Sequence, residues 1–319
     1  MKAAAGDRVR AAGGGAPARR PRLAITLGDP RGIGPEIVAR ALADERVRAA
    51  CTTYVIGPAG TAAPADEPSG RWSPGGTVAE AGAFAGRAVE RAARMALAGE
   101  VDGIVTAPLD KSALLEGGFD YPGHTEMLSG IAGVPVAMML ASEKLRVVLA
   151  TTHIALRDVP RAVTREAIVR AAGLTRTGLR EWFGIAEPRI ALCALNPHAG
   201  DGGRFGREDV ELLAPAARAA HVDGPFPADT VFVRAMRGAF DAVIAPYHDV
   251  GMTAIKVASF GSAVNVTLGL PFPRTSPDHG TALDIAGTGR ADPSSFIEAT
   301  LLCARIAARI PAHPPSSPR

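Results

Sequence analysis

The chain has 319 residues, of which 47% are hydrophobic and only 5% are aromatic, so it can bury a large core built mainly from aliphatic side chains. This length favours two domains or lobes over one. The formal net charge is +3, but residues 1–22 hold six basic side chains and one acidic side chain, so the remainder is slightly acidic. Because no basic stripe interleaved with aromatic residues follows, the composition argues against nucleic-acid binding.

Residues 1–21 form a basic segment without the apolar h-region of a secretory signal, and we expect this tail to be disordered. No window approaches 18 uninterrupted apolar residues, which argues against a membrane span and favours a cytoplasmic protein. Three cysteines, Cys51, Cys193 and Cys303, stand far apart without CxxC spacing. They are expected to be reduced thiols that pack as small hydrophobic side chains.

Short apolar runs alternate with helical segments in the first half of the chain. Runs at 22–27, 52–57 and 102–108 precede helical segments at 35–48, 77–99 and 110–115, respectively. This rhythm is typical of βαβ units and predicts an α/β fold with a mostly parallel sheet. The stretch 58–76 is rich in Pro, Gly and Ala and lacks periodicity, which predicts a surface connection.

The second half of the chain continues the pattern. Runs at 136–141 and 145–152 are close enough to form neighbouring antiparallel strands, and a long helix is expected over 163–183. Further apolar strands are predicted at 189–195, 241–246 and 263–268. A last helix is expected to begin with Asp292 as N-cap and Pro293 as its first residue. Residues 309–319 are expected to be disordered, and the sequence has no internal repeat.

Five of the seven histidines follow apolar strands or lie in loops marked by Gly and Pro: His124, His153, His198, His248 and His279. A single loop histidine is better explained by a local hydrogen bond. Five in such places are harder to dismiss, because parallel sheets bind ligands beyond the carboxyl ends of their strands. Three neutral imidazoles with open coordination positions would make a catalytic metal site. Since HExxH and HxH spacings are absent, local sequence does not identify the ligands.

Acidic and basic residues accompany these histidines. Asp229, Asp249 and Asp278 lie in turn-like segments, where aspartates are more often caps. Lys256 and Arg274 are cations set in apolar or turn segments, and a buried cation needs a partner that an anionic substrate could supply. Solvated side chains are an equally good explanation for either one alone.

The opening segment "ITLGDPRGIGPEI" places glycines before a helix but lacks GxGxxG spacing and the Walker lysine. It is therefore a weak nucleotide fingerprint. A tight strand-to-helix turn is at least as good an interpretation.

Taken together, these segments resemble one family. The chain is similar over about residues 22–308 to the 4-hydroxythreonine-4-phosphate dehydrogenase family of pyridoxal 5′-phosphate biosynthesis. The motifs are "ITLGDPRGIGPEI", "TAPLDK", "GHTEML", "ATTHIALRDV", "LNPHAGDGG", "GPFPADT", "YHDVG", "VNVTLGLPFPRTSPDHGTALDIAG" and "ADPSSFIEA". The resemblance implies a two-domain α/β/α subunit like isocitrate and isopropylmalate dehydrogenases, with discontinuous lobes and an active site in the interdomain cleft. It also implies a homodimer with shared active sites.

The resemblance assigns roles to individual residues. The metal ligands would be His153, His198 and His248, one of them supplied by the partner subunit, around one divalent ion such as Zn, Mg or Co. The substrate would be bound by His124, Thr125, Lys256, Asn265 and Arg274. NAD or NADP would be held by Gly280, Thr281 and Asp284. Lys256 is a further catalytic candidate, and Asp249 or Asp229 could orient a ligand or relay a proton.

The implied reaction is metal-dependent oxidation of the C3 hydroxyl of 4-phosphohydroxy-L-threonine by NAD(P)⁺. Loss of CO₂ then leaves 3-amino-2-oxopropyl phosphate. Two departures leave the substrate open: the 58–76 connection is shorter than usual in the family, and Val250 stands where glutamine is common. The alternatives are a dehydrogenase of 4-phospho-threonate or 4-phospho-erythronate, a metal-dependent phosphatase, and a metabolite-binding regulator without turnover.

Overall fold

A single mixed sheet crosses the molecule in the computed structural model, which describes residues 19–259 and 261–310. Residues 1–18 and 311–319, which hold most of the two segments expected to be disordered, lie outside the described residues. The strands follow one another across the sheet in the order β3 (Glu67–Arg71), β2 (Thr52–Ala59), β1 (Arg22–Thr26), β4 (Gly103–Thr106), β11 (Arg274–Pro277), β10 (Val264–Leu268), β5 (Ala137–Ala141), β6 (Arg146–Leu149), β9 (Ala242–Ala245), β7 (Ile190–Cys193) and β8 (Asp223–Phe226).

The strand pairing confirms the mostly parallel sheet. Antiparallel pairs among the described strands are confined to its middle, where β11, β10, β5 and β6 lie side by side. The predicted antiparallel pairing of the two runs that became β5 and β6 is among them. Strands β4, β7 and β9 are buried along their whole length, which explains why they read as continuous apolar runs.

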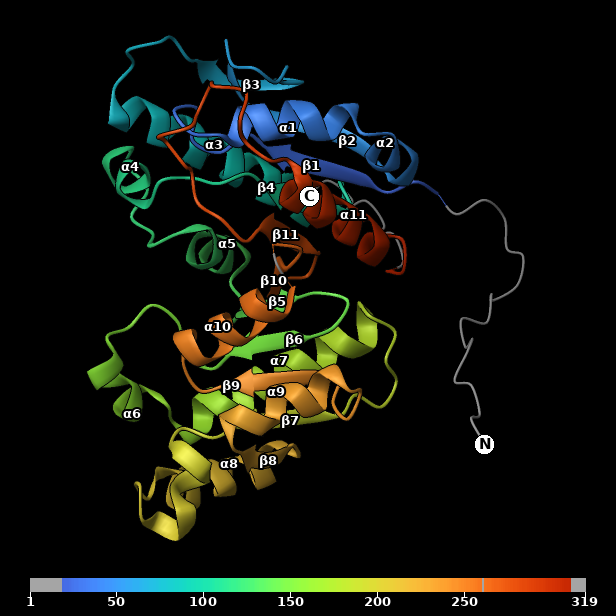
Figure 1. Cartoon of the computed structure of the whole chain (residues 1–319). Coiled ribbons are helices and arrows are strands. Elements are labelled where there is room, and N and C mark those ends of the chain that lie inside the picture. Colours follow the sequence, from blue (N-terminus) through green and yellow to red (C-terminus); the bar gives the residue numbers. More distant parts are fainter. Residues whose placement is uncertain (1–18, 260, 311–319) are drawn as a thin grey trace.

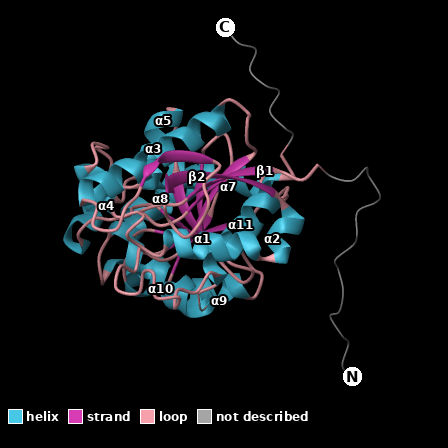
Figure 2. Cartoon of the chain, turned by 90° about the horizontal axis from the view of Figure 1, so that it is seen from above, coloured by secondary structure: helices cyan, strands magenta, loops and turns pink. Residues whose placement is uncertain are grey.

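Helices cover both faces of the sheet (Figures 1 and 2). They are α1 (Gly34–Ala43), α2 (Glu45–Ala50), α3 (Val78–Leu97), α4 (Lys111–Glu116), α5 (His124–Ala132), α6 (Val159–Ala162), α7 (Arg165–Glu181), α8 (Ala214–Ala220), α9 (Ala228–Met236), α10 (His248–Ser259) and α11 (Ser294–Ala307). The two long predicted helices are confirmed as α3 and α7. Each begins at a threonine cap, and Thr77 forms a reciprocal capping box with Glu80.

Some sequence-based expectations were wrong. The helix expected over 35–48 is two helices, because Asp44 leaves the helical conformation and caps α2 by accepting the N–H of Arg46. The connection 58–76 contains the edge strand β3. The last helix begins at Ser294, one residue later than expected, and the Asp292 carboxylate accepts the Ser294 N–H.

The sheet has two halves built from different parts of the chain. One half contains β1 to β4 and β11, with α11 returning from the end of the chain, whereas the other is built from residues 137–268. Figure 1 shows that the halves meet in the middle of the molecule, where β11 of the first half lies next to β10 and β5 of the second. The C-terminal end of the chain therefore completes the half that its beginning started.

The glycine-rich segment after β1 forms a tight strand-to-helix turn. This was one of the two interpretations of its sequence, the other being a nucleotide-binding fingerprint. Gly28 has φ +69°, and a Cβ there would lie 2.1 Å from the Pro108 carbonyl oxygen. At the far end of the turn, the Ile33 N–H donates to the Thr281 carbonyl oxygen over 2.9 Å. The turn thus holds a distant loop, 278–291, against the start of α1.

The three cysteines are free and buried, as expected of small hydrophobic side chains. Burial raises the pKa of Cys193 and Cys303 to about 12, which keeps both thiols protonated. Across residues 19–259 and 261–310, none of the helices combines the length and apolar character that a bilayer crossing requires.

Two helix glycines provide a matched test of packing. A Cβ at Gly82 in α3 would lie 1.7 Å from the Ala113 carbonyl oxygen of α4, whereas one at Gly173 in α7 would meet nothing within 4 Å. We expect Gly82→Ala to lower the free energy of unfolding by about 2 kcal/mol or more through overpacking. Gly173→Ala should raise it by about 0.5–1 kcal/mol through helix propensity. Urea unfolding measures both, and equal effects would contradict the close packing of α3 on α4.

Candidate functional site

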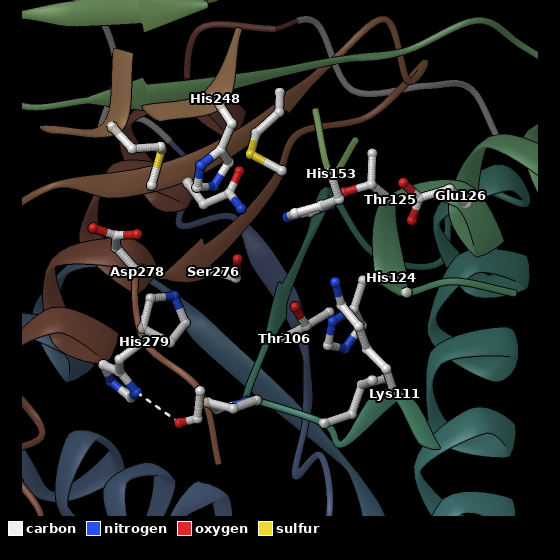
Figure 3. A pocket seen from close by; sticks show the side chains of 18 of the residues that line it. Thr106, Lys111, His124, Thr125, Glu126, His153, His248, Ser276, Asp278 and His279 are labelled. Atoms are coloured by element: carbon white, nitrogen blue, oxygen red, sulfur yellow. Dashed lines mark hydrogen bonds between the residues drawn. The ribbon is translucent and has the colours of Figure 1, made fainter. Parts of the chain in front are cut away.

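A cavity of about 510 Å³ opens where the two halves of the sheet meet. Figure 3 shows its polar side chains, with Lys111, His124, Thr125 and Glu126 on one side and Asp278 and His279 on the other. The polar side chains that line it come from both halves and include Thr106, Lys111, His124, Thr125, Glu126, His153, His248, Lys256, Asn265, Arg274, Ser276, Asp278 and His279.

Strand geometry brings three of these residues together. Arg274 and Ser276 are alternate residues of β11, so their side chains point to the same face of the sheet. Asn265 of β10 lies opposite Ser276 in the antiparallel pair. The Asn265 Oδ1 atom is buried and has no hydrogen-bond partner among the described residues. An incoming donor group could therefore satisfy it.

Arg274 is a buried cation in the middle of the sheet. Its side chain is only 2% exposed, and its guanidinium donates to the hydroxyls of Thr267, at 3.0 Å, and Thr106, at 2.6 Å. Its Nε atom has no partner, and no described carboxylate pairs with it. Burial lowers the pKa of Arg274 to about 10, so the group stays charged at neutral pH. A buried charge of this kind favours a bound anion.

The beginning of α5 adds further groups suited to an anion. Gly123 precedes α5 and has no side chain that could cap the helix. The first N–H groups of α5, at the end of the helix next to the cavity, therefore lack a side-chain acceptor from the N-cap residue. His124 is the first residue of this helix, and its Nε2 atom is buried without a hydrogen-bond partner among the described residues. Burial lowers the pKa of His124 well below its usual value, and the cations Arg274 and Lys111 lower it further. Negative charge here would be stabilised by two cations and a helix N-terminus.

Two of the three predicted metal ligands lie together. The ring centroids of His153, after β6, and His248, at the start of α10, are 5.4 Å apart. The Nδ1 atom of His248 lies 2.7 Å from Asp249 Oδ1, which leaves its Nε2 atom free. Burial lowers the pKa of His153, and Lys111 and His248 lower it further, which favours the neutral imidazole.

His198 does not join them. It lies in the loop Pro197–Gly203, where its ring contacts Phe205, and it does not line the cavity. Within the described part of this single chain, no group of three His, Cys, Asp or Glu side chains could hold a metal ion. One chain alone thus offers two of the expected three histidines.

Lys256 reaches the cavity from α10. Its Nζ atom lies 3.6 Å from Asp278 Oδ2, and the lysine side chain is 53% exposed whereas the aspartate is 15% exposed. Burial raises the pKa of Asp278, although the ion pair with Lys256 opposes the shift. The lysine thus brings an ammonium group to the cavity that Asn265 and Arg274 also line.

The predicted cofactor segment lies at the edge of the cavity. Gly280 lines it, whereas Thr281 and Asp284 lie farther along the same loop. Besides the bond from Ile33 to Thr281, the Arg40 guanidinium of α1 donates to the carbonyl oxygens of Ala291 and Gly289. The loop is therefore fixed to the first half of the sheet.

Two further predicted residues lie outside the cavity, and the sequence analysis missed several residues that line it. Asp229 is an exposed residue of α9 that does not line the cavity, and Asp249 does not line it either but forms a hydrogen bond with its neighbour His248. Thr106, Lys111, Glu126 and Ser276 line the cavity but were not proposed from the sequence. The signal for Lys111 was present, because it closes the segment "TAPLDK" just after a buried strand.

Comparison with known proteins gives the chain a family context. Residues 39–303 match the family model described as pyridoxal phosphate biosynthetic protein PdxA. A 4-hydroxythreonine-4-phosphate dehydrogenase from Geobacter metallireducens is 43% identical over 330 residues, covering 91% of this chain and 97% of the relative.

Solved structures agree in fold. A crystal structure of 4-hydroxythreonine-4-phosphate dehydrogenase from Klebsiella pneumoniae matches with a TM-score of 0.81 and 39% identity, covering 92% of this chain and 99% of that one. A β-decarboxylating dehydrogenase from Thermococcus kodakarensis matches with a TM-score of 0.50 at 17% identity, over 88% of this chain and 81% of that one. The latter is a likeness of fold alone, and it agrees with the dehydrogenase-like fold predicted from the sequence.

The buried guanidinium makes a prediction about anion binding. Inorganic phosphate should raise the melting temperature of the native protein, and Arg274→Met should weaken phosphate binding about tenfold or more by removing charge-assisted hydrogen bonds. Without phosphate, the free energy of unfolding of this variant should be within about 1 kcal/mol of the native value or higher, because a buried unpaired charge is gone. Thermal melts across a phosphate titration measure both quantities.

The control variant is Arg237→Met, which removes an exposed arginine outside the cavity. It should leave the phosphate response unchanged. Equal phosphate responses in the native protein and Arg274→Met would contradict an anion site at Arg274.

Proposed function

Because this chain belongs to the PdxA family of pyridoxal phosphate biosynthetic proteins, we propose that it is a 4-hydroxythreonine-4-phosphate dehydrogenase. It oxidises the C3 hydroxyl of 4-phosphohydroxy-L-threonine with NAD(P)⁺ and releases CO₂ to leave 3-amino-2-oxopropyl phosphate. The observation that carries the proposal is the buried, unpaired guanidinium of Arg274 in a cavity lined by histidines. A cytoplasmic location belongs to the same proposal.

Substrate anions bind to the cationic wall of the cavity. Arg274 and Lys111 supply positive charge, and the start of α5 offers His124 and Thr125. Asn265 Oδ1 accepts a hydrogen bond from a donor group of the substrate. Charge-assisted bonds of this kind contribute about 1.5–3 kcal/mol each. Binding energy from the phosphate on C4 can orient the neighbouring carbon C3, where the hydroxyl is oxidised.

The residues fit a divalent metal ion. His153 and His248 present imidazoles side by side, and Asp249 would fix the orientation of His248 by binding its Nδ1 atom. We assign the third position to the partner subunit's His198. Zinc and cobalt suit imidazole ligands better than magnesium. When bound, such an ion lowers the pKa of the substrate hydroxyl and stabilises negative charge on that oxygen.

The protein's own groups handle the proton and the cofactor. The Lys256 ammonium, held near Asp278, can donate a proton from Nζ to the carbon that loses CO₂. Asp249 contacts a proposed ligand, so we assign it the orienting role and assign none to Asp229. Gly280, Thr281 and Asp284 bind NAD or NADP on the loop that α1 holds in place.

We propose that the two halves of the sheet are lobes and that the active site lies between them in a homodimer. Exposed apolar side chains flank the metal-ligand segments: Ile154 and Leu156 follow His153, and Phe205 and Val210 follow His198. Burying them against a second copy would shield apolar surface from water. It would also bring the partner subunit's His198 to the pair formed by His153 and His248.

The reaction is tested by following NAD(P)H absorbance with an added divalent metal. 4-Phosphohydroxy-L-threonine should be turned over, and 4-hydroxythreonine should have a kcat/KM lower by about two orders of magnitude or more, because it lacks the phosphate contacts. Arg274→Ala should lower kcat/KM for 4-phosphohydroxy-L-threonine far more than for 4-hydroxythreonine. Equal turnover of the two compounds would sink the phosphate-binding role.

Rival activities give different outcomes in the same assay. A preference for 4-phospho-threonate or 4-phospho-erythronate would change the substrate but keep the site. A phosphatase would release inorganic phosphate without NAD(P)⁺, and a regulator would bind the phosphorylated acid without turnover.

Subunit mixing tests the shared site. His198→Ala and Arg274→Met should each be inactive alone, but a heterodimer contains one site that has its own Arg274, His153 and His248 and an intact His198 from the other subunit. After full exchange, the mixture should recover about a quarter of the native specific activity, since half the dimers carry one intact site.

The control mixes His248→Ala with Arg274→Met. In the proposed dimer, one chain supplies both His248 and Arg274 to each site. Each heterodimer site therefore lacks one of these two side chains, and no activity should return. If the first mixture also stays inactive although heterodimers are shown by mass spectrometry, His198 does not act across the interface.

A further inference from the structure

A second cavity, of about 780 Å³, lies apart from the candidate active site and shares no lining residue with it. Its walls come from the turn between β5 and β6, the end of α7, the end of α10 and one face of α11. Trp182 and Phe183 form an aromatic wall, and Leu302 and Ile306 lie on the α11 side. A volume of this size is typical of sites for small organic ligands.

The charge lining this cavity is mainly positive. Lys144, Arg146, Arg305 and Arg309 line it, against the carboxylates Glu143 and Glu298. Glu298 already pairs with Arg46, at 3.2 Å. Within the described part of the chain, none of the four cations forms an ion pair with a carboxylate. The cavity therefore combines apolar walls with an excess of positively charged side chains, although the Asp241 carboxylate interacts favourably with the Arg146 charge.

Two polar groups at the cavity are buried without partners. Arg146 donates from Nη1 to the Asp241 carbonyl oxygen at 3.1 Å, and its guanidinium stacks 4.9 Å from the Phe183 ring centroid, but its Nε atom has no partner. Ser259, 9% exposed at the end of α10, has an Oγ atom that also lacks a hydrogen-bond partner within residues 19–259 and 261–310. Buried polar atoms of this kind are rare unless something satisfies them.

From this combination we propose that the cavity is a second binding site, for an aromatic organic anion. A flat ring would pack against Trp182 and Phe183, and its carboxylate, sulfonate or phosphate would accept hydrogen bonds from Arg146, Ser259 and Arg305. The proposal does not depend on the reaction assigned above, because no residue of the two cavities is shared.

The site adjoins an element that also serves the first cavity. Ala258 and Ser259 at the end of α10 line the second cavity, whereas His248 and Lys256 of the same helix line the first. A ligand in the second cavity would thus contact α10 directly. It would do so without contacting any group that binds the substrate.

The probe for a test is 8-anilinonaphthalene-1-sulfonate, an aromatic anion whose emission rises when it leaves water. The chain has two tryptophans, so Trp72→Phe leaves Trp182 as the single energy donor at the cavity wall. We expect saturable binding of one probe per chain with energy transfer from Trp182. The neutral analogue N-phenyl-1-naphthylamine should bind about tenfold more weakly or worse, because it lacks the charged group.

Two variants locate the site. Ala258→Phe fills the cavity, and Arg305→Glu reverses an exposed charge at its edge, so each should weaken binding of the sulfonate about tenfold or more. Arg237→Glu makes the same charge change outside the cavity and should have no effect. Melting temperatures show whether each variant is folded, and Arg305→Glu decides the matter if Ala258→Phe is not. Unchanged energy transfer and affinity in Arg305→Glu, or equal binding of the neutral analogue, would overturn the proposal.

Discussion

The burial of the Arg274 guanidinium in the middle of the sheet is the constraint on which the site depends. Moving this charge out of water is costly, and among the described residues the threonine hydroxyls of β4 and β10 accept its hydrogen bonds while the Glu126 carboxylate adds a favourable charge interaction. Those two strands flank β11, so the charge lies at the seam between the halves of the sheet. The fold tolerates the arrangement because an open cavity adjoins the charge and can admit an anion. The buried Arg274 charge thus lowers the stability of the fold at the place where it can bind an anion.

Sequence reasoning found the strands whose own residues carry a signal. Strands β1, β4, β7 and β9 are buried on both faces and therefore appear as apolar runs. Strands β3, β8 and β11, with the sequences EPSGR, DGPF and RTSP, contain few apolar residues and were missed. Their strand conformation depends on hydrogen bonds to the strands beside them, and local sequence does not encode these long-range contacts. The short helix α5 was missed for a similar reason, because its polar first turn faces the cavity.

The site was predictable to the extent that its residues follow buried strands. His153 follows β6, and His248 and His124 begin α10 and α5, whereas Asn265 and Arg274 lie within β10 and β11; the cavity brings all five together. Thr106 and Ser276 were not predictable in this way, since a strand threonine or serine is ordinarily structural. His198 lies outside the cavity of its own chain, so its proposed role as a ligand requires a contact between subunits, which the sequence of one chain does not encode in a local pattern.

Different parts of the chain supply the proposed cofactor segment and the other cavity residues. The loop that contains Gly280 is held by hydrogen bonds from Ile33 and from Arg40 of α1, so the proposed cofactor segment is attached to the first half of the sheet. His153, His248 and Lys256 come from residues 137–268 and belong to the second half. Hydride transfer requires the substrate carbon and the cofactor to approach closely, and that approach depends on how the halves sit against each other. Arg274 of β11 forms hydrogen bonds to Thr106 of β4 in the first half and to Thr267 of β10 in the second, so its guanidinium links the two halves at the wall of the cavity.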